Sequence, residues 1–381
     1  MTKIHPQAYF GNVIVPFDSA NVSIASSAVL YGLSVYTVFP IIVVGDEVGD
    51  NNGDGVGVGV GDGEGDGEGD GEGGGKGSNA VDLEDTHREL FAFRLHDHYI
   101  RLVNSAKIIG IDMFEKEWNF EKFTTAVKEL IQANTINKLS FVRATIHVTD
   151  LVPGTRSRGL ATTLSMFIYE ANPIIPQNGA RLKTGVWRRV PDSSIPSRAK
   201  VNGAYINSVL GKQDAIDSGY DDCLFLDIQG QVCELSAANI FMVRDGVLIT
   251  PNQTSDILEG INRKTVIEIA HQLQIPVIER EVDLTEIYIA DELFACGTSA
   301  FIAPIAEVDK RKIGNGENYG NGRNDINEEK SSDIATFGAT VNTANNVNAT
   351  ITQKIKEVYV EIFSGKNKEY NERYLTRIMS A

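Results

Sequence analysis

The chain has 381 residues, which is long enough for two domains with separate cores. Hydrophobic residues make up 42% of it, as in ordinary globular proteins, and no apolar run reaches the length of a membrane-spanning helix. Residues 1–13 lack the charged and apolar regions of a secretory signal. We therefore expect a cytoplasmic protein that binds no membrane.

The three cysteines, Cys223, Cys233 and Cys296, have no metal-ligand spacing and are odd in number. The sequence therefore predicts neither a metal site nor a disulfide framework. The net charge of -16 comes mostly from one segment, since 13 acidic residues and one lysine lie between Asp46 and Asp85. Nucleic-acid backbones are bound by Lys and Arg, so we expect no nucleic-acid partner.

The first part of the chain predicts short strands within 9–17 and 22–44, because the apolar positions there follow no helical period. The composition then changes abruptly, and 45–79 is nearly all Gly, Asp and Glu. Such a segment cannot bury enough apolar surface to offset the entropy of ordering, so we expect a disordered insertion. A glycine-rich calcium-binding repeat is the alternative, but it needs a regular apolar position, which this segment lacks.

Ordered elements are expected again from residue 90. The apolar spacing predicts a strand, two amphipathic helices and two further strands, at 90–93, 96–109, 119–136, 139–149 and 163–171. The stretch 172–180 is rich in Pro and Gly and is predicted to connect two domains.

The second half predicts a helix at 204–217, a meander of strands, a helix at 261–273, and strands around a short helix. The meander is expected at 223–228, 231–235, 239–243 and 245–251. A second polar insertion, rich in Asn, is expected at about 312–348, before a last amphipathic helix over 350–362.

Two residues in 195–243 suggest chemistry. Lys200 lies among small and apolar residues next to a turn, in IPSRAKVNGAY, where partial desolvation would favour a nucleophilic amine that forms a Schiff base. Most lysines are solvated surface charges, so this context alone decides nothing. Glu234 is on a strand expected to be buried, where a carboxylate either caps the following turn or keeps a cofactor ring nitrogen protonated.

Four motifs, in order, make the chain resemble a known family. They are K-x-x-x-x-Y at Lys200 and Tyr205, GYDDCLFLDIQGQVCELSAANIFMVRDGVLITP at 219–251, ILEGINRKTVIEIA at 257–270, and ADELFACGTSAFIAPI at 290–305. Together they resemble the fold-type-IV (class IV) pyridoxal-phosphate aminotransferases, and branched-chain amino acid aminotransferases look closest. The resemblance covers nearly all of the chain outside the two insertions.

The resemblance implies an α+β fold with two domains. A small α/β domain would span 1–171, the connecting loop 172–180, and a larger domain with a β-barrel-like core 181–381. Enzymes of this family are homodimers or higher homo-oligomers, and we expect the same here.

The resemblance also assigns roles around the cofactor, pyridoxal 5'-phosphate. Lys200 looks like the Schiff-base lysine, Glu234 like the partner of the pyridine nitrogen, and Tyr205 like the tyrosine that bonds the phenolic oxygen. Arg94, in FRLHDHYIRL, resembles the arginine that clamps the phosphate, for which a guanidinium is suited. Leu258 matches the leucine that packs on the pyridine face.

The phosphate would also meet the turn at Gly260, Ile261 and Asn262, since a turn that opens a helix is a natural anion site. Thr298 and Ser299, in CGTSA, match a turn that binds phosphate and the substrate carboxylate.

The expected substrate side departs from the family pattern. The family often has H-Y-G-x-x-x-F-E-G, where this chain has LYGLSVYTV at 30–38, which keeps Tyr31 and the aromatic Tyr36. Branched-chain enzymes commonly have Tyr-x-Arg where this chain has Phe141 and Arg143. Phe301 replaces a residue that is usually acidic or polar. The resulting apolar and aromatic surroundings suit Leu, Ile or Val, and Arg143 suits the second carboxylate of glutamate.

The resemblance therefore implies transamination of branched-chain L-amino acids with 2-oxoglutarate, giving 2-oxo acids and glutamate. A D-amino acid aminotransferase and an aminodeoxychorismate lyase share the fold and stay as alternatives. A non-catalytic binding protein that keeps the fold is the alternative of a different class.

Overall fold

The computed structural model describes residues 2–45, 88–314 and 349–380. The insertions predicted at about 45–79 and 312–348 lie, apart from their first residues, outside these ranges, so their predicted disorder and the calcium-repeat alternative stay untested. Within the described ranges, no helix is both long enough and apolar enough to cross a bilayer.

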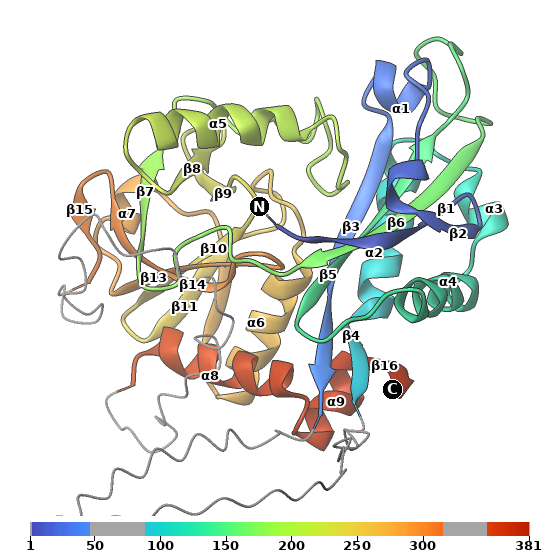
Figure 1. The fold of residues 1–381 in the computed structure, drawn as a ribbon. Coiled ribbons are helices and arrows are strands. Elements are labelled where there is room, and N and C mark those ends of the chain that lie inside the picture. The colour runs from blue at the N-terminus through green and yellow to red at the C-terminus, as the bar shows by residue number, and fades with distance from the viewer. Residues whose placement is uncertain (1, 46–87, 315–348, 381) are drawn as a thin grey trace, which may run out of the picture.

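The first sheet has seven strands, and each neighbouring pair is antiparallel (Figure 1). Its order is β16-β4-β3-β5-β6-β1-β2. The strands are β1 (Ile4–Phe10), β2 (Val13–Pro16), β3 (Ser34–Val44), β4 (Glu89–Phe93), β5 (Ser140–Val148), β6 (Thr162–Glu170) and β16 (Leu375–Ser380).

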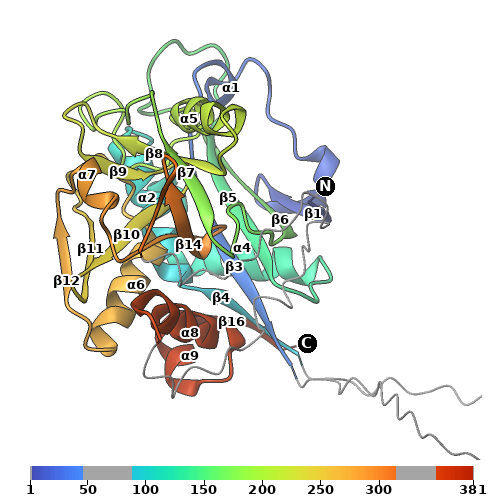
Figure 2. The same ribbon diagram turned by 90° about the vertical axis from the view of Figure 1, so that its left-hand side faces the viewer.

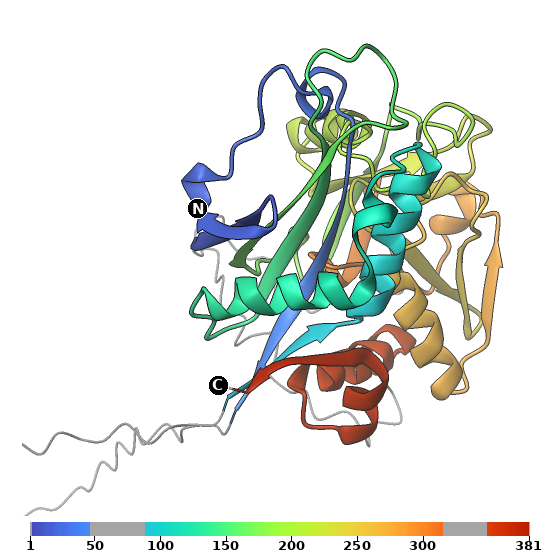
Figure 3. The same ribbon diagram turned by 90° about the vertical axis from the view of Figure 1, so that its right-hand side faces the viewer.

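Helices cover one face of this sheet, and Figure 3 shows the two long ones, α2 and α4. The helices of this half are η1 (Phe17–Ser19), α1 (Ser27–Leu30), α2 (Leu95–Ile108), α3 (Phe114–Glu117) and α4 (Phe120–Gln132). Because side chains alternate along a strand, Val35 and Phe39 of β3 pack in the core beneath the helices. Tyr36 and Val38 point the other way, into a core shared with the second half of the chain.

The second sheet has nine strands in the order β12-β11-β10-β13-β14-β7-β8-β9, with β15 beside β14. The strands are β7 (Ala180–Thr184), β8 (Asp222–Leu226), β9 (Val232–Leu235), β10 (Asn239–Arg244), β11 (Val247–Pro251), β12 (Val277–Arg280), β13 (Glu292–Gly297), β14 (Phe301–Val308) and β15 (Arg311–Lys312). The end strand β9 contacts β10 again, and Leu235 N–H donates to the carbonyl of Ala238, the residue just before β10. This curls the sheet into a half-barrel, which confirms the expected α+β fold with a barrel-like core.

Helices α6 and α8 lie side by side (Figure 2), and both pack against β13. The helices of this half are α5 (Tyr205–Asp217), α6 (Ile261–Gln272), α7 (Leu284–Ile287), α8 (Ile351–Ser364) and α9 (Lys368–Tyr374). Thr350 and Gln353 form a reciprocal capping box at the start of α8, so this helix begins where the sequence predicts it.

The C-terminal strand β16 crosses to the first half of the structure. The sequence assigns all of 181–381 to the larger domain, but β16 pairs with β4 of the first sheet, with Leu375 opposite Phe93. Without β16, β4 would be a buried apolar strand with an open edge, and β16 covers that edge. Residues 375–380 therefore belong to the first sheet.

The two sheets meet where the start of β3 contacts the Lys200 segment. Tyr36 N–H donates to the Lys200 carbonyl over 3.0 Å, and Val35 forms an isolated bridge with Val201. This contact places Lys200 between the sheets, next to the face of β3 that carries Tyr36.

Candidate active site

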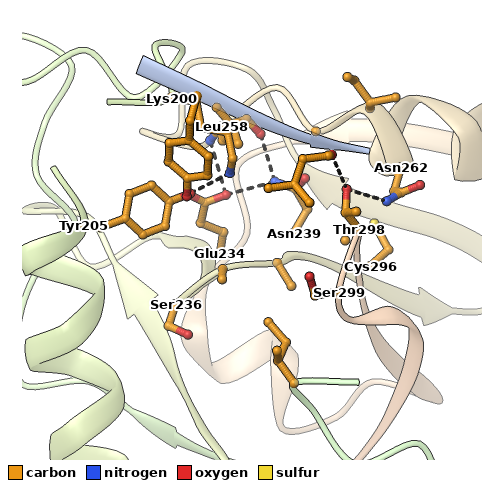
Figure 4. A pocket seen from close by; sticks show the side chains of 18 of the residues that line it. Lys200, Tyr205, Glu234, Ser236, Asn239, Leu258, Asn262, Cys296, Thr298 and Ser299 are labelled. Atoms are coloured by element: carbon orange, nitrogen blue, oxygen red, sulfur yellow. Dashed lines mark hydrogen bonds between the residues drawn. The ribbon is translucent and has the colours of Figure 1, made fainter. Parts of the chain in front are cut away.

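A cavity of about 160 Å³ lies between the two sheets. Most of the residues predicted for the site line it: Tyr36, Arg143, Lys200, Tyr205, Glu234, Leu258, Gly260, Ile261, Asn262, Thr298 and Ser299. Figure 4 shows Lys200, Tyr205 and Glu234 grouped at one side of the cavity, with Asn262 and Thr298 at the other. The arrangement thus has an amine and a carboxylate at one end and a helix-opening turn at the other.

Lys200 is fixed at both its main chain and its amine. Its N–H donates to the Ser105 hydroxyl over 3.0 Å, and its Nζ donates to the Tyr205 hydroxyl over 2.6 Å. Burial lowers the pKa of Lys200, and the charge of Arg101 lowers it further, although Tyr205 opposes both. The amine therefore loses its proton more readily than an exposed lysine does, which the sequence context only suggested.

Tyr205 is the first residue of α5 and lies close to Tyr36, with ring centroids 5.4 Å apart. Burial alone would raise the pKa of the Tyr205 phenol, but the charge of Lys200 and its hydrogen bond outweigh burial and lower it. The amine and the phenol thus form a short hydrogen bond in which each group favours the charged form of the other.

Glu234 is a buried carboxylate, and its bonding partners offset the free-energy cost of burying its charge. It pairs with Arg189 over 2.7 Å and accepts from Asn239 Nδ2 over 3.0 Å and from Leu258 N–H over 3.2 Å. Burial raises the pKa of Glu234, and Arg189 counteracts this shift. The carboxylate therefore orders the distant Leu258 turn, and it also lines the cavity.

The turn at Gly260 opens α6 towards the cavity. The first N–H groups of a helix have no acceptor within it, and they attract anions. A Cβ at position 260 would collide with the side-chain oxygen of Asn239, so only glycine fits. Asn262 Nδ2 donates to the Thr298 hydroxyl over 3.4 Å, and the hydroxyl of Tyr359, from α8, donates to Asn262 Oδ1 over 2.9 Å. These bonds hold the 260 and 298 turns together as one cradle.

Arg101 lines the same cavity and was not predicted from the sequence. Its Nη2 donates to the Thr37 hydroxyl over 3.1 Å, its Nε has no partner among the described residues, and burial lowers its pKa to about 10. A buried guanidinium with so few partners suits an anion in the cavity. The sequence signal was its spacing on the helix, since the buried polar residues His98 and Ser105 lie three residues before it and four after it.

Arg94 does not line the cavity, contrary to the expectation that it clamps a phosphate. It begins α2 with φ +48°, and its guanidinium pairs with Glu268 of α6 over 3.0 and 3.1 Å and with Asp97 over 2.6 Å. Another of its bonds goes to the Thr265 hydroxyl. These bonds join α2 to α6 and hold the Arg94 guanidinium away from the cavity.

Two expected substrate residues also lie elsewhere. Tyr31 is 45% exposed after α1, and Phe141 is fully buried behind the cavity wall against Tyr169 and Phe301. Tyr169, which the sequence did not single out, lines the cavity instead, as does Ile174.

Comparisons with known proteins agree with this geometry. The family model for Amino-transferase class IV matches residues 87–308. A probable branched-chain-amino-acid aminotransferase of Synechocystis sp. is 31% identical over 314 residues, which cover 82% of this chain and 88% of that protein. One of Aquifex aeolicus is 36% identical over 231 residues, which cover 60% and 73%.

A solved structure of similar fold is the branched-chain aminotransferase from Thermoproteus uzoniensis with norvaline. Its TM-score is 0.74 at 29% identity, and the match covers 98% of this chain and 100% of that one. The chain belongs to the class IV aminotransferases, and it is an enzyme of that class.

The surroundings of Lys200 make a prediction about its pKa. Replacing Tyr205 with Phe removes a group that raises the pKa of Lys200, so that pKa should fall further. Arg101→Gln removes a nearby positive charge, so the pKa of Lys200 should rise. The pH dependence of Lys200 acetylation by acetic anhydride in the apoprotein, read by mass spectrometry, measures both shifts. Exposed Lys107 in the same digest is the control, and shifts of equal sign in the two variants would contradict the account.

Proposed function

We propose that the chain transfers the amino group of branched-chain L-amino acids to 2-oxoglutarate, with pyridoxal 5'-phosphate as its cofactor. The observation that carries the proposal is the cavity itself, in which the Lys200–Tyr205 pair and the Glu234 carboxylate lie opposite a helix-opening anion cradle. The named relatives in Synechocystis sp. and Aquifex aeolicus support the substrate class.

The residues present fit the cofactor. Class IV aminotransferases depend on pyridoxal phosphate, and a Thermobaculum terrenum enzyme of the same fold, with TM-score 0.72 and 24% identity, has been solved in its PLP form. The Gly260 turn, Thr298 and the unpartnered Nε of Arg101 would hold the phosphate. Glu234 would face the pyridine nitrogen and Leu258 the ring. When bound, the cofactor supplies an electron sink that makes the substrate α-hydrogen acidic.

The protein residues position groups and move a proton. Lys200 Nζ, whose pKa burial lowers, takes the proton from the substrate α-carbon as general base and later returns one as general acid. The Tyr205 hydroxyl holds Nζ in place through its 2.6 Å bond. Burial raises the pKa of Glu234, and its 2.7 Å ion pair with Arg189 opposes this shift and favours the carboxylate form, which would in turn favour a protonated ring nitrogen opposite it.

The substrate side combines apolar surfaces with one cation. Tyr36, Val38, Tyr169 and Ile174 provide the aromatic and apolar wall, which suits branched aliphatic side chains. Arg143 provides the positive charge for the second carboxylate of glutamate or 2-oxoglutarate. The N–H groups of the Thr298–Ser299 turn are our proposed site for the substrate α-carboxylate.

We also propose a homodimer, as expected from the sequence. Large apolar side chains are exposed at the start of α5 and in neighbouring loops, among them Ile206 (62% exposed), Val209 (58%) and Trp187 (45%). Such a patch is typical of an interface. Tyr31 keeps its proposed substrate-binding role if it acts across this interface, which would account for its exposure. The cytoplasmic location stays a prediction.

Substitution of Arg101 should affect cofactor affinity, whereas substitution of Arg94 should affect stability. Arg101→Gln should weaken cofactor binding by about 100-fold, since charge-assisted hydrogen bonds are worth about 1.5–3 kcal/mol each. Arg94→Gln should leave cofactor binding within about 10-fold but lower the free energy of unfolding by about 1–3 kcal/mol, because Glu268 and Asp97 lose their most buried partner and keep only Arg373 and Lys264. Absorbance titration of the apoprotein and urea unfolding measure the two effects. The assignment fails if Arg94→Gln has the larger effect on affinity.

A substrate panel tests the reaction. The holoenzyme should convert L-leucine, L-isoleucine and L-valine with 2-oxoglutarate, and should act on D-alanine or aminodeoxychorismate at less than about 1% of that rate, because the wall near Arg143 is aromatic and apolar. Lys200→Ala is the control and should lose at least about 1000-fold. Preference for D-alanine would identify a D-amino acid aminotransferase, and pyruvate release from aminodeoxychorismate would identify a lyase.

A further inference from the structure

Arg143 presents its charge to the cavity without an acidic partner. Its guanidinium carbon lies 3.6 Å from the ring centroid of Tyr36, and its Nη2 donates to Asn202 Oδ1 over 2.6 Å. Among the described residues, no carboxylate forms an ion pair with it. A neutral amide and an aromatic face therefore fix the guanidinium, and neither cancels its charge.

Asn202 is itself held in one orientation. It follows Lys200 by two residues, its Nδ2 donates to the Ser34 hydroxyl over 2.7 Å, and its N–H donates to the Ser34 carbonyl over 2.9 Å. Because the Arg143 guanidinium can only donate, it fixes the amide oxygen of Asn202 towards itself, and the amide nitrogen is left to donate to the Ser34 hydroxyl. Asn202 thus connects β3, the Lys200 loop and the Arg143 guanidinium.

We propose that Asn202 is a positioning residue for dicarboxylate substrates: it orients Arg143, stacked on Tyr36, to receive the second carboxylate of glutamate or 2-oxoglutarate. This role of Asn202 rests on the proposed function. It would allow one cavity to accept both branched aliphatic side chains and the side-chain carboxylate of a dicarboxylate. A weakly hydrated guanidinium lying on a ring leaves the wall open to aliphatic side chains, while its free edge binds a carboxylate bidentately.

Residue 202 must be neutral if Arg143 is to keep its charge available for a substrate carboxylate. An aspartate of the same size would form an ion pair with Arg143 and compete with the substrate carboxylate. An alanine would leave the charge but lose its orientation. The leucine half-reaction uses no side-chain carboxylate, so neither change should affect it much.

The experiment uses the full-length holoenzyme and follows each half-reaction by the cofactor absorbance. Asn202→Asp should lower kcat/KM for L-glutamate by at least about 30-fold more than for L-leucine, and Asn202→Ala by about 5-fold more. Ser34→Ala is the matched control, because it removes the hydroxyl partner of Asn202 Nδ2 but keeps both the Arg143–Asn202 Oδ1 bond and the main-chain bond of Asn202 to the Ser34 carbonyl, so it should change both substrates alike. Glutarate is an unreactive dicarboxylate whose affinity can be measured by calorimetry. It should bind less tightly to Asn202→Ala than to the unchanged enzyme, and least tightly to Asn202→Asp.

The outcomes separate this proposal from the proposed function. Equal losses for glutamate and leucine in Asn202→Asp, or no loss in either, would overturn the role of Asn202. If the unchanged enzyme transaminates neither substrate, the proposed function fails, and glutarate binding still decides the role of Asn202. Unchanged glutarate affinity in both Asn202 variants would overturn it.

Discussion

The main-chain bond from Tyr36 N–H to the Lys200 carbonyl joins the two halves of the structure at the point where the chemistry is placed. It fixes the first sheet against the loop that carries the amine. The other parts of the site are placed relative to this contact. Helix α5 begins with Tyr205, five residues after Lys200, and β3 brings Tyr36 and Val38 to the cavity wall. Because the cavity lies between two sheets, neither half of the chain could build it alone.

The charged side chains that line the cavity favour anionic ligands. Arg101, Arg143, Arg189 and Lys200 line it, and Glu234 is the acidic residue among its lining side chains. Arg189 is paired with Glu234, so the charges of Arg101 and Arg143 stay available in partly buried positions. A phosphate and substrate carboxylates complement this excess of positive charge. Burial also lowers the pKa of Lys200, so the same desolvation that favours anion binding prepares the base.

Residues in local motifs could be predicted from the sequence, and residues placed by packing between elements could not. Lys200, Tyr205 and Gly260 could be named from the sequence because their motifs resemble those of a known family, and Gly260 also because a turn that opens a helix is a natural anion site. Arg94 shows the limit. It shares α2 with Arg101, and only the docking of α2 on α6 decides which arginine meets Glu268 and which meets the cavity. The strand β16 was missed for a similar reason, because a short strand becomes recognisable only once the edge of β4 is there to pair with it.

The central claim is that Lys200 is the residue that carries the cofactor. The most direct test is borohydride reduction of the holoenzyme, followed by digestion and mass spectrometry. The account predicts a phosphopyridoxyl group on the peptide that contains Lys200 and on no other lysine. A modified peptide from elsewhere in the chain, or an unmodified Lys200 peptide from a protein saturated with pyridoxal phosphate, would contradict it.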